Sequence, residues 1–356
     1  MHYTVQSGDT LWLIAQRFRS DLRAIAQANS IEEPYHVHPG QVLHIPRRHR
    51  LIGFIPDYAA AEGIADALAS PESFNEVIYT FLRVQSDGTV LAGAVDRALQ
   101  VLRARRTRVL AGVTNLTEAE YSSEAASAAL MADDSRSHLA ACIVDAVTTC
   151  CLDGVCLDIQ GIGPDHWDAL RDLVCEVRSR FSRLSPHYTT ALVFPYDWLE
   201  TGLDLARMSE WVDLMIMEGY EKGAGAVEGP PTTMSWLEEN VRAAIDKMGT
   251  SKLTVALGIY GLDWTEGEDP AYLTAEAAER ISRETSASIE RSQDDGTPGF
   301  SYYDASGKMH RVWYEDVMSV AMKVDLLDRL GIRKIALWRL GTNPCNLLSS
   351  ALNIGV

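Results

Sequence analysis

From residue 51 onward, short apolar runs rich in β-branched and aromatic residues alternate with helix-like segments, and there are eight such runs. Near-continuous apolar strands separated by helices are typical of parallel sheets that are covered on both faces. Eight strand–helix repeats predict an α/β fold, a closed (β/α)8 TIM barrel, with a doubly wound open sheet as the alternative. The expected strands are Leu51–Pro56, Glu76–Val84, Arg108–Asn115, Gly154–Gln160, Tyr188–Pro195, Val212–Tyr220, Leu253–Tyr260 and Lys334–Gly341.

Segments with helical periodicity lie between these runs, and one connection is longer than the others. The clearest helical segments are Ser137–Cys150, Trp167–Arg180 and Trp236–Met248. The stretch from about 263 to 323 is too long for a simple crossover, and residues 299–314 have the pattern of a hairpin. We therefore expect a barrel domain over residues 51–356 with an insertion at about 263–323.

The first 47 residues have a different pattern, with the order β-α-α-β. A strand around Tyr3–Val5 precedes two short helices, of which Asp21 can cap the second, and a strand at 41–46 closes the unit. A core this small is marginal on its own. A basic stretch at 47–50 joins this unit to the barrel.

This unit, residues 1–47, resembles a LysM module. The resemblance is carried by Gly8-Asp9-Thr10-Leu11-Trp12-Leu13-Ile14-Ala15 and by Pro39-Gly40-Gln41-Val42-Leu43-His44-Ile45-Pro46. LysM modules bind N-acetylglucosamine-containing glycans with the loop after the first strand and the loop after the second helix. The resemblance implies glycan binding by Gly8, Asp9, Thr10, Leu11, Asn29 and Ile31. Asp9 and Thr10 can also cap the first helix, and the two roles are compatible.

The fourth expected strand ends in Asp153-Gly154-Val155-Cys156-Leu157-Asp158-Ile159-Gln160. With a period of two, Cys156, Asp158 and Gln160 share one face. The segment resembles the Asp-Gly-x-x-x-Asp-x-Glu signature of glycoside hydrolase family 18, with departures at Cys156 and Gln160. Met217-Glu218-Gly219-Tyr220-Glu221 and Ala336-Leu337-Trp338-Arg339-Leu340-Gly341 resemble two further landmarks of that family. Together with the LysM-like unit, nearly the whole chain resembles the spore germination and cortex-lytic glucosaminidases of spore-forming bacteria.

The resemblance implies a substrate-assisted N-acetylglucosaminidase mechanism. In that mechanism a Glu protonates the leaving oxygen, and the preceding Asp orients the substrate's own 2-acetamido group for attack. Asp158 occupies the position of that Asp, Tyr220 the position that hydrogen-bonds the acetamido oxygen, and Trp338 the floor of the sugar subsite. Position 160 is Gln, which donates an amide hydrogen bond but no proton, and loss of a general acid costs about 10² to 10⁴ in rate. We expect slow cleavage or none.

Two questions about this site stay open at the level of sequence. Gln160 is either an introduced substitution or a natural one, and the departures at Cys156, Glu218 and Gly219 favour natural divergence. Glu218 alternates onto the face of Tyr220, where the family has an apolar Met. It is either a relocated acid or a buried carboxylate paired with Asp158, Gln160 or Arg339, and two close carboxylates tend to share a proton.

Three other residues are assigned to substrate binding. Asn115 and Tyr260 lie at strand ends, where the catalytic groups of such barrels gather. Asp153 is assigned on its match to the first Asp of the signature.

Composition limits the partners. The net charge of −17 disfavours a nucleic-acid-binding face. The sequence contains no run of 18 uncharged apolar residues, so no membrane-spanning segment is expected. The six cysteines and nine histidines show no metal spacing, no cofactor loop is readable, and no secretory signal is visible, so we expect no metal and no cofactor. The expected partner is a peptidoglycan or chitin-like glycan, and the expected location is the cytoplasm, the spore coat or the cell wall.

Two main functions remain. The first is a hydrolase of N-acetylglucosaminyl bonds that Gln160 disables or that uses another acid. The second is a non-catalytic, lectin-like wall or spore-coat protein. A scaffold whose barrel binds another protein is a weaker third.

Overall fold

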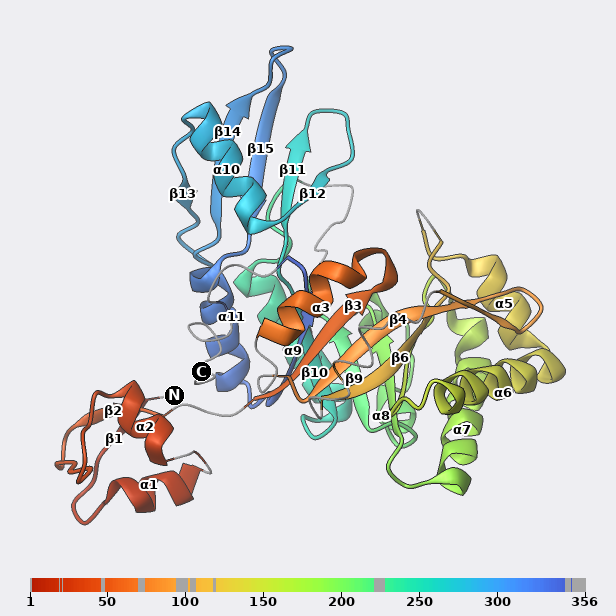
Figure 1. Cartoon of the computed structure of the whole chain (residues 1–356), viewed down its shortest axis with the longest axis horizontal. Coiled ribbons are helices and arrows are strands. Elements are labelled where there is room, and N and C mark those ends of the chain that lie inside the picture. Colours follow the sequence, from red (N-terminus) through yellow and green to blue (C-terminus); the bar gives the residue numbers. More distant parts are fainter. Residues whose placement is uncertain are drawn as a thin grey trace.

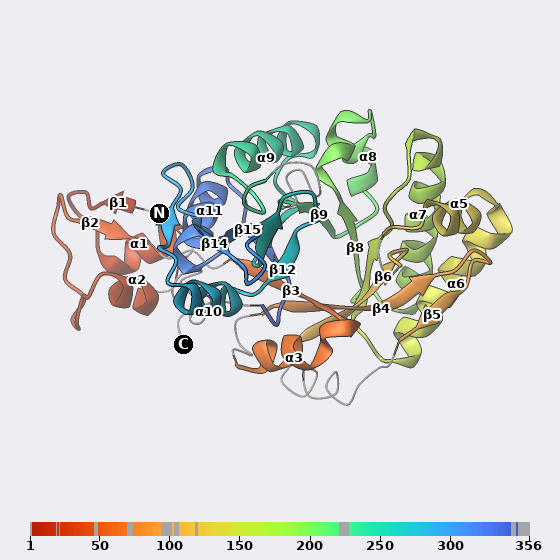
Figure 2. The same cartoon turned by 90° about the horizontal axis from the view of Figure 1, so that it is seen from above.

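The computed structural model describes residues 2–18, 20, 22–45, 49–69, 74–93, 102, 107–117, 120–220, 228–342 and 347 (Figures 1 and 2). Asp21, Pro46, Arg47, Arg48 and Glu221, which belong to segments that the sequence analysis mentions, lie outside these residues.

Among the described residues, eight parallel strands close into a barrel. Their order around the ring is β3-β16-β10-β9-β8-β7-β6-β4, and pairing of β3 with β4 closes it. This closing pair excludes the open-sheet alternative and confirms the TIM barrel. The strands are β3 (Arg50–Pro56), β4 (Glu76–Val84), β6 (Arg108–Thr114), β7 (Gly154–Asp158), β8 (Thr189–Phe194), β9 (Leu214–Glu218), β10 (Leu253–Gly258) and β16 (Lys334–Trp338). A short strand that the sequence analysis did not predict, β5 (Val90–Ala92), pairs antiparallel with β4.

Helices cover the outside of the barrel (Figure 2). They are α3 (Ala60–Ala69), α5 (Ser123–Met131), α6 (Asp133–Thr149), α7 (Trp167–Leu184), α8 (Leu205–Ser209), α9 (Met234–Met248) and α11 (Val317–Arg329). Side chains alternate along the strands: Val155 and Leu157 of β7 belong to the apolar cluster that contains the helices, whereas Cys156 belongs to a separate cluster with Ile52 and Ile216. Asp158, two residues after Cys156, therefore points inward as well.

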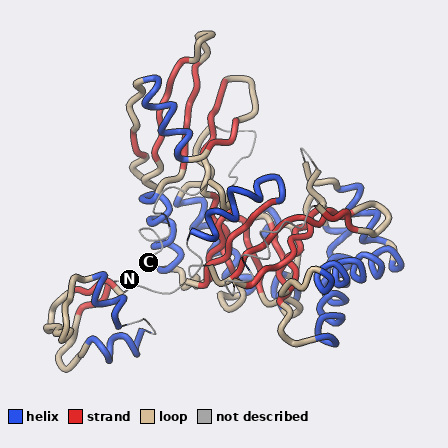
Figure 3. The backbone as a smooth tube through the Cα atoms, viewed as in Figure 1, coloured by secondary structure: helices blue, strands red, loops and turns tan. Residues whose placement is uncertain are grey.

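An antiparallel sheet is inserted between β10 and α11, and it stands away from the barrel strands (Figure 3). Its strand order is β12-β11-β15-β14-β13, with helix α10 (Ala275–Thr285) in the same segment. The strands are β11 (Gly261–Thr265), β12 (Ala271–Leu273), β13 (Glu290–Arg291), β14 (Pro298–Tyr303) and β15 (Met309–Tyr314). β14 and β15 pair as neighbours, so the predicted hairpin is confirmed.

A buried ion pair lies where the inserted sheet joins α11. Lys323 Nζ is 2.8 Å from both carboxylate oxygens of Glu315, and the two side chains are 1% and 0% exposed. Ser319 donates a further hydrogen bond to Glu315, and Thr297 lies 3.4 Å from Nζ. Because both charges are removed from water, each depends on the other for compensation.

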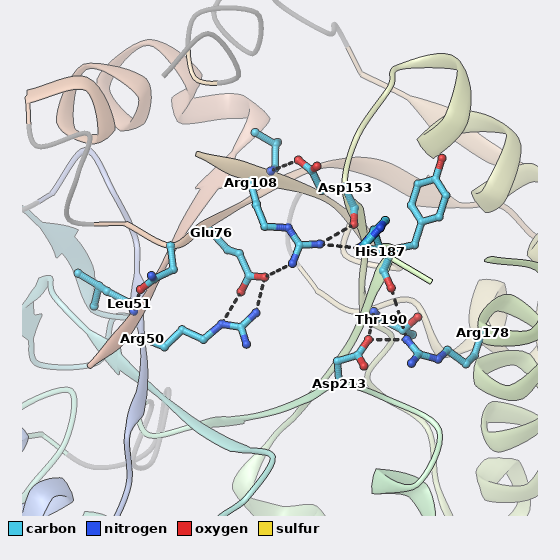
Figure 4. A network of polar contacts seen from close by, with 12 residues as sticks. Arg50, Leu51, Glu76, Arg108, Asp153, Arg178, His187, Thr190 and Asp213 are labelled. Atoms are coloured by element: carbon cyan, nitrogen blue, oxygen red, sulfur yellow. Dashed lines mark hydrogen bonds and ion pairs between the residues drawn. The ribbon is translucent and has the colours of Figure 1, made fainter. Parts of the chain in front are cut away.

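Charged groups also meet at the amino ends of the barrel strands (Figure 4). Arg50 and Arg108 both pair with the fully buried Glu76. Asp153, just before β7, accepts a hydrogen bond of 2.8 Å from the backbone N–H of Val109 at the start of β6. These contacts tie the starts of neighbouring strands together, at the opposite end of β7 from Asp158.

The N-terminal unit consists of β1 (His2–Thr4), α1 (Leu11–Phe18), α2 (Leu22–Ala28) and β2 (Val42–His44). β1 and β2 pair antiparallel, which confirms the β-α-α-β order. The core consists of Val5, Leu11, Ile14, Ala15, Ile25, Ala26, Leu43 and Ile45.

Candidate active site

Three polar side chains meet at the carboxyl ends of β7 and β9. Asp158 ends β7, Gln160 lies two residues further on, and Glu218 ends β9. Gln160 Nε2 donates hydrogen bonds to Asp158 Oδ1 at 2.7 Å and to Glu218 Oε1 at 3.0 Å. The amide N–H₂ must face this way, because an amide oxygen here would oppose two carboxylate oxygens. The carboxamide thus bridges two acidic groups.

Two tyrosines add a second donor to each carboxyl group. Tyr121 donates to Asp158 Oδ2 at 3.1 Å, and Tyr220 donates to Glu218 Oε1 at 3.3 Å. Tyr220 and Glu218 therefore share a face, as the alternation along β9 predicts. Tyr121 was not predicted, because it lies in the loop between β6 and α5, where no strand periodicity indicates direction. Its position directly before the α5 cap residue Ser122 is the one local signal.

Aromatic rings lie beside this polar cluster. The Trp338 ring stacks on Tyr220 with ring centres 6.2 Å apart and 16° between their planes. Trp338 also makes an edge contact with the ring of Phe54, with ring centres 5.5 Å apart. Tyr260 meets Tyr220 edge-on at 6.3 Å and also contacts the exposed Tyr272. Half-buried Trp338 thus offers part of a flat apolar face next to groups that accept and donate hydrogen bonds.

Asn115 holds the backbone of Gln160 in place. Its Oδ1 accepts from Gln160 N at 2.9 Å, and its Nδ2 donates to the carbonyl oxygens of Gln160 and Ser122 at 2.8 and 3.0 Å. The side chain is buried, and both ends of its amide are occupied. The assignment of Asn115 to substrate binding is therefore corrected: it positions Gln160.

Asp153 does not belong to this site. Its carboxylate is bound to Val109 N at the amino end of the barrel, whereas Asp158, Gln160 and Glu218 lie at the carboxyl ends of the strands. Its assignment to substrate binding is wrong because the signature spans β7 from one end to the other. The structure gives Asp153 a role in joining β6 to β7.

Cys156 lies one layer below Asp158, inside the barrel. Burial, and then the nearby Asp158 carboxyl, raise the pKa of its thiol well above its usual value, so it stays protonated. Within the described parts of the chain, no group of three or more His, Cys, Asp or Glu side chains is placed to hold a metal ion. None of the helices in these described parts is both long and apolar enough to span a membrane.

The LysM-like residues divide into exposed loop positions and structural ones. Gly8 is exposed with φ +89°, and Thr10 Oγ1 caps α1 by accepting from Leu13 N. Asp9 accepts from Tyr3 and from the backbone of Gln6, which fixes the loop after β1.

Two LysM assignments need correction. The Leu11 side chain is 1% exposed and belongs to the core of the unit, so it offers no apolar contact to a ligand. Asn29 uses its amide to join the end of α2 to β2, with bonds to Ile25 O, His44 O and His44 N. Ile31, half-buried against the same core, keeps some exposed surface.

Known families match both parts of the chain. Residues 3–46 match the LysM domain, and residues 50–343 match Glycosyl hydrolases family 18. The chain belongs to glycosyl hydrolases family 18.

Several of the proteins similar to this chain come from Bacillus species. The chain is 25% identical to the putative sporulation-specific glycosylase YdhD of Bacillus subtilis, over 95% of this chain and 84% of that protein. It is 27% identical to the cortical fragment-lytic enzyme of Bacillus subtilis, over 76% of this chain and 66% of that protein. The crystal structure of the Bacillus megaterium spore cortex-lytic enzyme SleL shares the fold, with a TM-score of 0.77 at 20% identity, over 98% of this chain and 85% of SleL.

Proposed function

We propose that this chain binds N-acetylglucosamine-containing glycans of the peptidoglycan type through its LysM domain and its barrel, and that it cleaves them slowly or not at all. The observation that carries the proposal is the Gln160 carboxamide, which occupies the acid position and donates to Asp158 and Glu218. A carboxamide holds its N–H hydrogens at neutral pH, so it has no proton for a leaving alkoxide. The retained groups Asp158, Tyr220 and Trp338 support binding of the acetamido sugar.

The contacts of Glu218 favour binding over a relocated acid. Its Oε1 accepts from both Gln160 and Tyr220. An oxygen that accepts two hydrogen bonds is stabilised as a carboxylate oxygen rather than as a proton donor. This arrangement supports the buried-carboxylate interpretation, in which the partners are Gln160 and Tyr220.

The unmodified chain should bind chitotetraose and release almost no new reducing ends. Titration calorimetry measures the binding, and a reducing-end assay on the same sample measures cleavage. Trp338→Ala should lower the affinity of the barrel for chitotetraose by about tenfold, since an aromatic contact of this kind contributes on the order of 1.5 kcal/mol. Phe181→Leu, a change in the outer core, is the matched control and should leave affinity unchanged. Rapid cleavage by the unmodified chain would contradict the proposal.

The LysM domain should bind chito-oligomers by itself. Residues 1–50 enclose the described core from Val5 to Ile45, and we expect measurable heat on titration with chitotetraose at millimolar concentrations. Circular dichroism must first show that the fragment is folded. A folded fragment that gives no heat would remove the LysM part of the proposal and leave the barrel part standing.

A further inference from the structure

Arg339 lies next to Trp338, the proposed floor of the sugar subsite, and takes no part in the proposed chemistry. It follows Trp338 directly at the carboxyl end of β16, and its guanidinium carbon lies 5.3 Å from the centre of the Tyr58 ring. Tyr58 follows β3, the neighbour of β16, and is 65% exposed. The guanidinium is therefore held at the rim of the barrel, beside the aromatic group of Trp338 and Phe54.

Arg339 differs from the other half-buried arginines among the described residues in its lack of a carboxylate partner. Each of the other half-buried arginines there has a carboxylate at ion-pair distance: Arg50, Arg83, Arg108, Arg136, Arg171, Arg178, Arg180 and Arg333. Among the described residues Arg339 pairs with no carboxylate. Its Nη1 lies 3.5 Å from Leu340 O, and the guanidinium also hydrogen-bonds the side chain of Tyr58. Within the described ranges, neither contact neutralises the positive charge of the guanidinium.

The backbone around Arg339 is fixed by its neighbours. Thr342 Oγ1 donates to Arg339 O at 2.7 Å, and Leu340 N donates to Phe54 O at 2.9 Å. These contacts fix the backbone from which the side chain starts, and the Tyr58 ring restricts the guanidinium itself, so less side-chain freedom is lost on binding. A guanidinium held in this way suits a planar carboxylate, which it can bind through two parallel hydrogen bonds.

We propose that Arg339 binds a carboxylate carried by the glycan, so that the barrel selects carboxylate-bearing N-acetylhexosamine polymers, such as muramic acid-containing strands, over neutral chitin. The inference rests on the proposed function and gives it a substrate class. The net charge of −17 adds to the argument, because an anionic polymer is repelled by the protein as a whole and needs a local cation where it binds.

The test compares two tetrasaccharides on the full chain by titration calorimetry: chitotetraose, and a peptide-free fragment in which N-acetylglucosamine alternates with N-acetylmuramic acid. We expect the muramic acid fragment to bind more tightly. Arg339→Gln should weaken it by about tenfold while chitotetraose changes by less than about twofold, and Arg339→Lys should keep part of the preference. Arg333→Gln, at the other end of β16, is the control and should change neither affinity. The LysM domain contributes equally to every variant, so differences report on the barrel.

The outcomes separate this inference from the proposed function. Equal loss for both glycans, or no loss for either, in Arg339→Gln overturns the carboxylate site. If chitotetraose binding still depends on Trp338, the proposed function survives that result. If the dependence on Arg339 is present only with peptide-bearing fragments, the carboxylate that it binds lies on the peptide, and a site for a carboxylate of the glycan is overturned.

Discussion

Gln160→Glu is expected to raise the rate of reducing-end release from N-acetylglucosaminyl glycans by about 10² or more. The new side chain would place a carboxyl group between Asp158 and Glu218, both of which Gln160 now contacts at 2.7 and 3.0 Å. Three acidic groups this close cannot all ionise, so one must hold a proton near neutral pH. A proton held between Asp158 and the leaving oxygen is what the family mechanism requires of its acid.

Two further variants make this experiment decisive. Gln160→Met removes the amide hydrogen bonds without adding an acid and should stay inactive. If the unmodified chain already cleaves as fast as Gln160→Glu, the acid lies elsewhere, and Glu218→Gln should then abolish the activity. If Gln160→Glu binds glycan and stays inert, Cys156 and Glu218 have changed the site beyond what one acid restores, and the lectin-like function is favoured.

Lys323→Met is expected to lower the free energy of unfolding of the barrel by about 3–5 kcal/mol, because it leaves the carboxyl of Glu315 buried without its cation. Burial raises the pKa of Glu315, against the opposing effect of Lys323. A raised pKa stabilises the fold below the ordinary carboxyl pKa and costs stability as the pH rises. The deficit of Lys323→Met should therefore be smaller at pH 5 than at pH 8, as measured by denaturant unfolding.

Two controls distinguish the buried pair from an ordinary ion pair. Arg242→Met breaks the exposed pair with Glu238 and should change stability by less than about 1 kcal/mol. The double variant Lys323→Met/Glu315→Leu removes both buried charges and should recover part of the loss. A Lys323→Met deficit that is no larger than that of Arg242→Met would show that the pair contributes little.

The fold was predictable because each barrel strand carries its own local signal. The runs such as Gly154–Gln160 are apolar on both faces, and only a sheet covered on both sides accepts such strands. Their observed ends are shorter by up to three residues: Ile159 and Gln160 already leave the β7 ladder, and β16 ends at Trp338 rather than at Gly341. β5 escaped prediction since three half-exposed or exposed residues, Val90–Ala92, have no periodicity to recognise.

The site was predictable only in part. Alternation along a strand places Gln160 on the face of Asp158 and Glu218 on the face of Tyr220, and these side chains do meet. The resemblance adds Trp338 and the roles of the residues. Sequence does not show which hydrogen bonds a side chain has already made, so Asn115, Asn29 and Leu11 were taken for ligand contacts although they hold the fold together. Tyr121 required the path of a loop, for which the α5 cap at Ser122 is the one local signal.

The inserted sheet begins and ends at one place. Gly261, the first residue of β11, is paired with Tyr314, the last residue of β15, so the two chain crossings lie about 5 Å apart. On the barrel side, β10 and β16 remain bonded to each other from Val255–Ile335 to Gly258–Trp338 without any help from the insert. A gene that lost, enlarged or exchanged residues 261–314 would consequently need only a tight turn at that point, and the ring of strands would not have to open. Residues 261–314 can therefore change in length or sequence during evolution while the strand pairing of the barrel stays the same.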